Sequence, residues 1–388
     1  MIALCSANGL TSAANPTKLL CVAMPAVIPT VDLELRADPI RLKAWIIEQA
    51  FDLGFTACGV TTPDTRDQIP YLQQFLDDGF AGNMTYLAEH MDKRANPALL
   101  WAGTRSVISL RMDYLVEPPP HRHIPDVPNH AIVARYARGR DYHKTVRSRT
   151  KQLADRIEAK IGHFISRPFV DSAPIFEKAL AQNAGLGWTG KHTLLINKQA
   201  GSFFLLAELF TDLDLPVDSA VSAHCGSCTA CMHICPTQAI VAPYRLDARL
   251  CIAYLTIEYK DSIPLELRRA IGNRVFGCDD CQLICPWNGF AKLSNEIDFK
   301  PRQGLDQIRL LDLWRWDERE FLARTEGSPL RRIGYAGLMR NVAIGLGNAP
   351  YSAEIIAALE AVRGQRGELV DEHLQWAMEE QHLKQQPT

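Results

Sequence analysis

Four closely spaced cysteines followed by a proline constrain this chain more than any other feature of its sequence. They are Cys225, Cys228, Cys231 and Cys235, with the spacing C-x2-C-x2-C-x3-C, and Pro236 comes directly after them. Gaps of two residues let one turn of chain point three thiolates at a single [4Fe–4S] cube. The longer gap and the proline then lead the chain away, so the fourth sulfur is directed toward another cluster.

A second, incomplete run of the same kind follows further along the chain. It consists of Cys278, Cys281, Cys285 and Pro286, and Val275 stands where its first cysteine would be. Cys251 lies upstream and has no other assignment, so we take it as the displaced ligand. The crossed pattern then predicts two ligand sets. The cluster-1 cysteines are Cys225, Cys228, Cys231 and Cys285, and the cluster-2 cysteines are Cys235, Cys251, Cys278 and Cys281.

Structural zinc and a disulfide network are the alternatives for so many cysteines. A zinc site also takes four ligands, but zinc gives no reason for the crossover at x3-C-P. The remaining cysteines, Cys5, Cys21 and Cys58, do not supply a disulfide framework. Thiolate-bound clusters and unpaired thiols both suit a reducing compartment, and this favours a cytoplasmic protein.

The length and patterning of the chain divide it into four regions. Its 388 residues are enough for two or three domains. Residues 1–36 carry few charges, and we expect a disordered extension there, with a signal peptide or an early start codon as alternatives. Strands and helices alternate over 37–215, which predicts an α/β or α+β domain. A cysteine domain at 216–300 and a helical-repeat module at 301–388 complete the chain.

Several local signals locate individual elements and limit the partners. Order should begin at Asp38, an N-cap followed by Pro39 at the first helical position. Amphipathic spacing predicts helices over 335–346, 353–362 and 368–384. No apolar run is long enough to cross a membrane. The net charge of −2 gives no overall sign of a nucleic-acid or anionic-membrane partner.

Three motifs have both a structural and a functional interpretation. Gly185, Gly187 and Gly190 fit G-x-G-x-x-G, but the predicted order is helix before and strand after, the reverse of a dinucleotide site. We therefore expect a turn that lets a broad ligand approach the backbone. Asp171 before Ser-Ala-Pro reads as a helix N-cap, or as a proton donor whose pKa burial would raise. The basic segment 135–160 is a solvated helix face or a phosphate-binding stripe.

Taken together, several stretches make the chain resemble the epoxyqueuosine reductase family over about residues 38–350. They are residues 91–97, 105–110, 134–143, 170–174 and 185–192, together with both cysteine runs. The displaced Cys251 is itself part of the family pattern. The N-terminal extension departs from that pattern, and so does His192, where relatives often carry Asn.

The resemblance implies an α+β multidomain protein with an α/β core that binds cobalamin. A ferredoxin-like domain with two [4Fe–4S] clusters and a C-terminal HEAT-like helical module would follow that core. The implied activity is reduction of epoxyqueuosine to queuosine at the wobble position of tRNA. Cobalamin chemistry would remove the epoxide oxygen with two electrons and two protons, giving an alkene and water.

The resemblance also implies roles for single residues and partners. Asp171 would be the proton donor, and Asp141 and Lys178 would lie on the substrate side. The implied cobalamin contacts are Arg94, Ala134, Asp171, Leu195 and Asp279. The basic segment and the C-terminal module would hold the anticodon stem-loop, with Arg331, Arg332 and Arg340 as the tRNA-binding residues. An external low-potential electron donor, no membrane contact and a monomeric state complete the expectation.

Other functions share part of this inventory. A respiratory-type reductive dehalogenase has the same cofactors, but it should carry a twin-arginine export signal and lack a tRNA-binding tail. A ferredoxin-type electron carrier would contain no corrin. An RNA-binding scaffold stabilised by clusters would bind tRNA without turnover.

Overall fold

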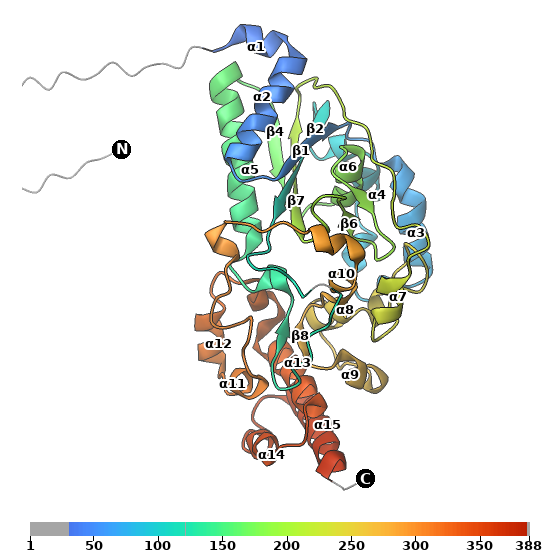
Figure 1. Cartoon of the computed structure of the whole chain (residues 1–388), viewed down its shortest axis with the longest axis vertical. Helices are drawn as coiled ribbons and strands as arrows, with labels where there is room; N and C mark the ends of the chain where they lie inside the picture. Colours follow the sequence, from blue (N-terminus) through green and yellow to red (C-terminus); the bar gives the residue numbers. More distant parts are fainter. Residues whose placement is uncertain (1–30, 121, 386–388) are drawn as a thin grey trace, which may run out of the picture.

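The computed structural model describes residues 31–120 and 122–385, and Figure 1 shows the course of the chain. Its helices are α1 Leu33–Ala37, α2 Pro39–Asp52, α3 Ile69–Asp77, α4 Met91–Ala95, α5 Tyr142–Ile161, α6 Glu177–Asn183, α7 Ala230–Ile234, α8 Ile252–Ile257, α9 Leu265–Ile271, α10 Asp280–Leu283, α11 Leu310–Trp314, α12 Glu318–Arg324, α13 Gly334–Asn348, α14 Ala353–Glu360 and α15 Glu368–Gln385. Its strands are β1 Ala57–Thr61, β2 Ser106–Asp113, β3 Ile132–Val133, β4 Ser166–Phe169, β5 Trp188–Thr189, β6 Leu195–Ile196, β7 Phe204–Thr211 and β8 Arg274–Phe276.

A four-stranded sheet with the order β1-β2-β7-β4 forms the centre of the N-terminal half. Every neighbouring pair in it is antiparallel, with Cys58 opposite Leu110 and Ser109 opposite Glu208. Of the two classes expected for residues 37–215, the structure therefore has α+β. The long central strands β2 and β7 are largely buried because helices cover both faces of the sheet.

Helices α2 and α5 pack on one face of this sheet, and α6 lies on the other (Figure 1). The first face buries Ile46 of α2 and Val146 of α5 against Ile108 and Leu209. The second face buries Leu180 of α6 against Val107 and Phe210. Helix α5 begins at the end of the sheet where β4 finishes, and α6 follows β4 at that same end. The polar first turns of the two helices therefore lie close together.

Order begins earlier than Asp38, so the expectation of a disordered stretch through residue 36 is wrong at its C-terminal end. Residues 33–37 form α1, and the side chain of Asp32 caps it by accepting from the Leu35 N–H at 2.9 Å. Asp32 also pairs with Lys160 of α5 at 3.2 Å, and Leu35 is buried in the sheet core. Residues 1–30, with Cys5 and Cys21, lie outside the described part.

The C-terminal helices share one core with the cysteine segment. Buried residues of α8, α9 and β8 join those of α11 to α15 in a single cluster, with α13 at its centre. The helices expected at 335–346, 353–362 and 368–384 are confirmed as α13, α14 and α15. The boundary expected at residue 300 therefore lies between two segments that bury their apolar surface together.

Arg340 lies inside this core, so its predicted place on an RNA-binding surface is wrong. It is only 1% exposed, on the inner face of α13. Its guanidinium donates to the backbone carbonyls of Leu255, Tyr259 and Asp261 and to Asn341, each at 2.9–3.0 Å. Sequence spacing could not reveal that these carbonyls from the cysteine segment would surround the cation.

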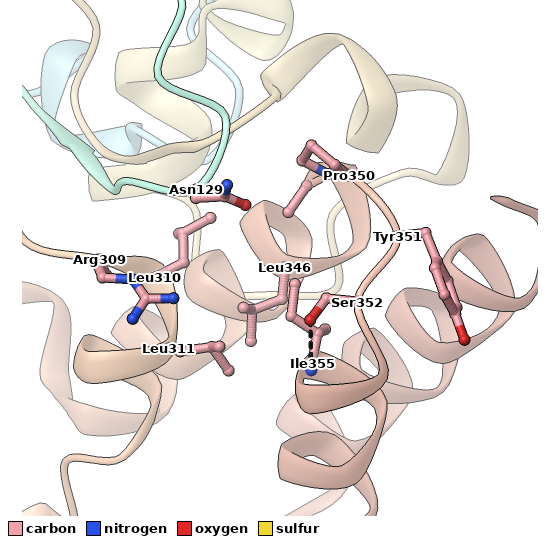
Figure 2. Close-up of a pocket in the computed structure, with 10 residues that line it drawn as sticks. Asn129, Arg309, Leu310, Leu311, Leu346, Pro350, Tyr351, Ser352 and Ile355 are labelled. Carbon is pink, nitrogen blue, oxygen red and sulfur yellow. Dashed lines mark hydrogen bonds between the residues drawn. The ribbon is translucent and has the colours of Figure 1, made fainter. Parts of the chain in front are cut away.

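A cavity of about 250 Å3 lies among α11, α13 and α14 (Figure 2). Leu310, Leu346 and Ile355 supply apolar walls, and Arg309 lies at one side. Its lining shares no residue with the cavity that the cysteines form. Among residues 31–120 and 122–385, no helix combines the length and apolarity needed to span a membrane.

Candidate active site and cluster-binding cysteines

The cluster-1 cysteines converge on one cavity of about 210 Å3. Cys225 and Cys228 lie on the loop before α7, Cys231 lies in α7, and Cys285 immediately precedes the 3-10 turn Pro286–Phe290. Ile196 and Trp287 add apolar walls. The structure thus brings together three cysteines of the first run and the last cysteine of the second, as the crossed pattern predicts.

Lys191 holds the loop that carries these cysteines. Its ammonium group donates to the carbonyls of Gly226 and Cys228 at 2.6 and 2.9 Å. Cys228 is exposed, whereas Cys231 and Cys285 are buried. One side of the cavity therefore lies close to the protein surface, and the other reaches the interior beside the hairpin of β5 and β6.

Two buried N–H donors beside this cavity find no acceptor in the described part of the protein. They are Nε1 of Trp188, which packs against Cys285, and Nε2 of His192, which lines the cavity. The Leu194 N–H donates to Nδ1 of His192 at 3.2 Å, so the ring carries its proton on Nε2. Unpartnered buried donors cost free energy, and the sulfur atoms of a cluster would supply acceptors. A [4Fe–4S] cluster therefore fits this thiol-lined site.

The cluster-2 cysteines lie near one another, where α7 ends and where α8 and α10 begin. Cys235 leaves α7 in an extended conformation, Cys251 precedes α8, and Cys278 and Cys281 flank the start of α10. Burial raises the pKa of Cys281 well above its usual value, and the neighbouring Cys251, Cys231 and Cys235 raise it further. The Cys281 thiol therefore needs a cation nearby before it loses its proton, and iron would provide one.

Asp171 lies in a left-handed backbone conformation just after β4. Its φ is 55°, and its N–H donates to Oε1 of Glu177 at 2.5 Å. Such a conformation is uncommon outside glycine and is held here by that hydrogen bond. Asp171 does not cap α6, so the N-cap interpretation is wrong. Its side chain is instead 51% exposed and directed toward the beginning of α5.

A connected set of polar side chains surrounds the Asp171 carboxylate. The Tyr142 hydroxyl donates to Oδ2 at 2.6 Å, and Nε2 of His143 lies 3.2 Å from the same oxygen. The other nitrogen of His143, Nδ1, lies 2.7 Å from Oδ1 of Asp141. Asp141 is also the N-cap of α5, which fixes the ring of His143 between two carboxylates.

The charges in this set oppose the effect of burial. Burial raises the pKa of Asp171, but the hydrogen bonds from His143 and Tyr142 outweigh it, and the pKa is lowered. The raised pKa expected of a proton donor is therefore not found. Burial lowers the pKa of His143, but its bonds to Asp141 and Asp171 raise it to about 9. Burial and the charge of Asp171 raise the pKa of Glu177 to about 8.

Lys178 and Arg332 act on the same polar site around Asp171, which also includes Asp141, Tyr142, His143 and Glu177. Lys178 is exposed, yet its surroundings desolvate it and lower its pKa. Its ammonium group donates to the Thr193 carbonyl at 2.7 Å. Arg332 comes from the C-terminal half, pairs with Glu258 at 2.5 Å and lies close enough to Asp171 to lower its pKa. Arg331 beside it is exposed.

Besides Asp171, the residues expected to contact cobalamin lie in four separate segments. Arg94 is 7% exposed in α4 and donates to the carbonyls of Tyr86 and Glu89. Ala134 lies beside β8, where an added Cβ on Gly277 would come within 2.7 Å of the Ala134 Cβ. Leu195 is buried in β6. Asp279, next to Cys278, accepts from the Arg135 N–H at 2.9 Å and pairs with its guanidinium at 3.1 Å.

The sequence interpretation missed three residues of this site. Tyr142 and His143 follow Asp141 directly, and Glu177 precedes Lys178. All three act on Asp171 in the structure. The run Asp-Tyr-His at a predicted helix start was the available signal, because a polar first turn points its side chains beyond the helix end.

Two sets of four cysteines, together with a separate set of paired charges around Asp171, point to the class of protein, an iron–sulfur oxidoreductase. Residues 224–288 match the family model described as "4Fe-4S double cluster binding domain", which removes zinc and disulfides as alternatives. Residues 94–172 match the model described as "Epoxyqueuosine reductase QueG, DUF1730".

Whole-chain comparisons identify the family. The chain is 54% identical to the epoxyqueuosine reductase of Pseudomonas aeruginosa, over 90% of this chain and 97% of that protein. It is 49% identical to the enzyme of Escherichia coli, over 90% and 91%. A crystal structure of an epoxyqueuosine reductase with an epoxyqueuosine-modified tRNA-Tyr stem loop matches with a TM-score of 0.80 and 27% identity, over 88% and 90%. The chain belongs to the epoxyqueuosine reductase family.

Proposed function

We propose that this protein reduces epoxyqueuosine to queuosine in the anticodon stem-loop of a tRNA. The main support is the family membership, since relatives with half of their residues identical carry this name over nearly their whole length. A solved relative that covers most of the chain was crystallised with an epoxyqueuosine-modified stem loop. Such a reaction would take place in the cytoplasm, where tRNA and a reducing environment coexist.

Two [4Fe–4S] clusters would carry electrons from an external low-potential donor. The cluster-1 cysteines provide four thiols around one cavity, and the cluster-2 cysteines provide a second group buried beside α10. Soft thiolate ligands in sets of four suit iron–sulfur clusters. Because Cys228 is exposed, the cluster-1 site would accept electrons from the donor in solution, and cluster 2, whose ligand Cys278 precedes Asp279, would pass them on.

Cobalamin would be held by Arg94, Ala134, Asp171, Leu195 and Asp279. Gly277 lets its own segment pack close to Ala134, because an added Cβ would come within 2.7 Å of the Ala134 Cβ. When bound, cobalamin supplies a reducible cobalt centre for breaking the carbon–oxygen bond of the epoxide.

The protein's own residues would supply the proton, the orientation and the RNA contact. Asp171 would protonate the epoxide oxygen, because an alkoxide is a poor leaving group. Asp141 and Lys178 would lie on the substrate side of Asp171. Arg331 and Arg332, on the edge of the HEAT-like C-terminal helices, would contact the phosphates of the stem-loop. The protein would act as a monomer.

A direct assay tests this function. Anaerobic protein with cobalamin and a low-potential reductant is incubated with tRNA carrying epoxyqueuosine, and the nucleosides are measured by mass. We expect loss of one oxygen atom from the modified base, with no conversion when cobalamin is omitted. Conversion without cobalamin would refute the cofactor assignment, and no conversion in the complete mixture would refute the function.

A further inference from the structure

The acid proposed for the reaction cannot hold its own proton before each turnover. Tyr142 and His143 both stabilise the ionised carboxylate of Asp171, and the lowered pKa leaves it charged near neutral pH. Removing the epoxide oxygen as water consumes two protons, so Asp171 has to take up a proton before it can give one. Besides solvent, which reaches its 51% exposed side chain, the structure offers three neighbours, namely Tyr142, Glu177 and His143.

Glu177 and Tyr142 are poorer immediate sources of the proton. The contact of Glu177 with Asp171 is made by its Oε1, which accepts from the Asp171 backbone N–H, so it does not lead to the side-chain carboxylate. Tyr142 does donate to the carboxylate, but burial and the charge of Asp171 raise its pKa far above the usual value. Giving up that proton would leave a buried phenolate beside a carboxylate. Tyr142 therefore orients Asp171 and keeps its own proton.

His143 meets the requirements of a proton source. Its Nε2 lies 3.2 Å from Oδ2 of Asp171, so a proton can pass between them directly. Its Nδ1 lies 2.7 Å from Asp141, which orients the ring and stabilises the imidazolium. The side chain is 30% exposed and can exchange protons with solvent. The ring also stacks on Tyr142, with ring centroids 4.1 Å apart, so it has little freedom to leave.

We propose that His143 recharges Asp171, so that Asp141, His143 and Asp171 form a proton relay from solvent to the substrate oxygen. This inference rests on the proposed function. In each transfer the N–H bond at Nε2 breaks and an O–H bond forms at Oδ2 of Asp171. Asp171 then gives that proton to the departing oxygen and returns to the carboxylate. The neutral imidazole takes a new proton from water, while the electrons come from the external donor through the clusters.

The charged groups in contact with the imidazole favour this role. Asp141 and Asp171 face its two nitrogens, and Glu177 lies behind Asp171. Lys178 and Arg332 carry positive charge near Asp171, but both interact with its carboxylate at longer range and do not form an ion pair with it. Two carboxylates in direct contact outweigh these more distant cations, and they hold the pKa of His143 near 9. His143 thus acts on Asp171, not on the substrate.

The decisive variant is His143→Gln, which keeps a polar side chain but cannot carry a proton. In single-turnover reactions started with reduced protein, we expect about a 100-fold lower rate near neutral pH. Its tRNA affinity should stay within about twofold of the wild type, because the ring does not bind RNA. Added imidazole should restore the rate in proportion to its concentration. The matched control is His163→Gln, an 84% exposed histidine paired with Glu158.

The pH dependence separates a relay from a structural role. The wild-type rate should fall as the pH rises through about 9, and this fall should disappear in His143→Gln. A slow variant that keeps the wild-type pH profile and gains nothing from imidazole would overturn the relay. So would a variant with the wild-type rate.

An NMR titration of the histidine rings tests the inference without turnover. The pKa of His143 should be raised in the wild type and should fall in Asp141→Asn and in Asp171→Asn. If the wild type fails to convert epoxyqueuosine, the proposed function is refuted, and the relay is then judged by this titration. An ordinary His143 pKa in the wild type would overturn the relay in either case.

Discussion

The cluster-1 cavity and the polar site around Asp171 differ in their chemistry. The cavity is lined by thiols, aromatic rings and aliphatic groups, with two buried N–H donors that have no partner in the described part of the chain. The polar site around Asp171 consists of charged groups that already pair with one another, as Asp141, His143 and Asp171 do. The first suits a cofactor that brings its own charge, and the second suits proton transfer.

The comparison teaches that electrons and protons would reach the substrate by separate routes. The cysteine sets lie on the α7 to α10 side, and the carboxylates lie at the start of α5 and before α6. A change on one side should therefore leave the other side intact. The following predictions test that independence, from the largest expected effect to the smallest.

Asp171→Asn should abolish proton supply without disturbing the clusters. We expect the rate to fall by about 10² to 10⁴-fold, since this is the usual contribution of a general acid. Iron content and the visible spectrum should match the wild type, because the Asp171 side chain bonds to Tyr142 and His143 of α5 and not to the cluster cysteines. The matched control is Asp214→Asn, whose exposed partner is Arg105. Retained conversion in Asp171→Asn would remove Asp171 as the acid.

Cys251→Ser should remove one iron–sulfur cluster and leave the polar site around Asp171 unchanged. Wild-type protein prepared without oxygen should hold about eight iron atoms, from two cubes, and the variant about four. Cys58→Ser is the control, because Cys58 is another thiol but lies in β1 away from both sets. Wild-type iron content in Cys251→Ser would show that the displaced ligand is assigned wrongly.

Replacing Arg331 and Arg332 together by alanine should weaken tRNA binding about tenfold and reduce its salt dependence. Each lost phosphate contact lowers the slope of log affinity against log salt by about one. Arg319→Ala, another exposed arginine of the C-terminal helices, is the control. Arg340→Ala should instead destabilise the fold, by about 3 kcal/mol, since it leaves buried carbonyls unpaired. Equal affinity in the double variant would exclude this edge as the RNA contact.

The smallest expected effect is the pH dependence of stability, which should arise from His143 and Glu177 beside Asp171. The pKa of His143 is raised in the folded state from 6.5 to about 9, so its stabilising contribution is complete below about pH 6.5. That contribution is lost as the pH rises from 6.5 to 9. Glu177, with a raised pKa of about 8, works in the same direction because its buried charged form is disfavoured. Denaturant unfolding at several pH values should show a shallower decline in His143→Gln than in the wild type.

Family relationship and local geometry could be predicted from the sequence because their signals are short-range. The spacing of the two cysteine runs predicts which thiols share a site, since gaps of two or three residues limit the directions in which the sulfurs point. The ends of α2 and of α13 to α15 follow similarly from caps and helical spacing. Ligand sets and helices therefore needed little information beyond the chain itself.

The tertiary structure alone decided which charges meet and which are buried. Arg332 and Arg340 have similar sequence surroundings, yet Arg332 lies near Asp171 and pairs with Glu258, whereas Arg340 is buried in the core. The pKa of Asp171 depends on Tyr142 and His143, from a helix that begins well before it in the chain. Burial and pairing result from contacts between distant segments, and no local pattern encodes them. The sequence by itself predicted which cysteines belong together, and the tertiary structure decided which charged side chains meet around Asp171.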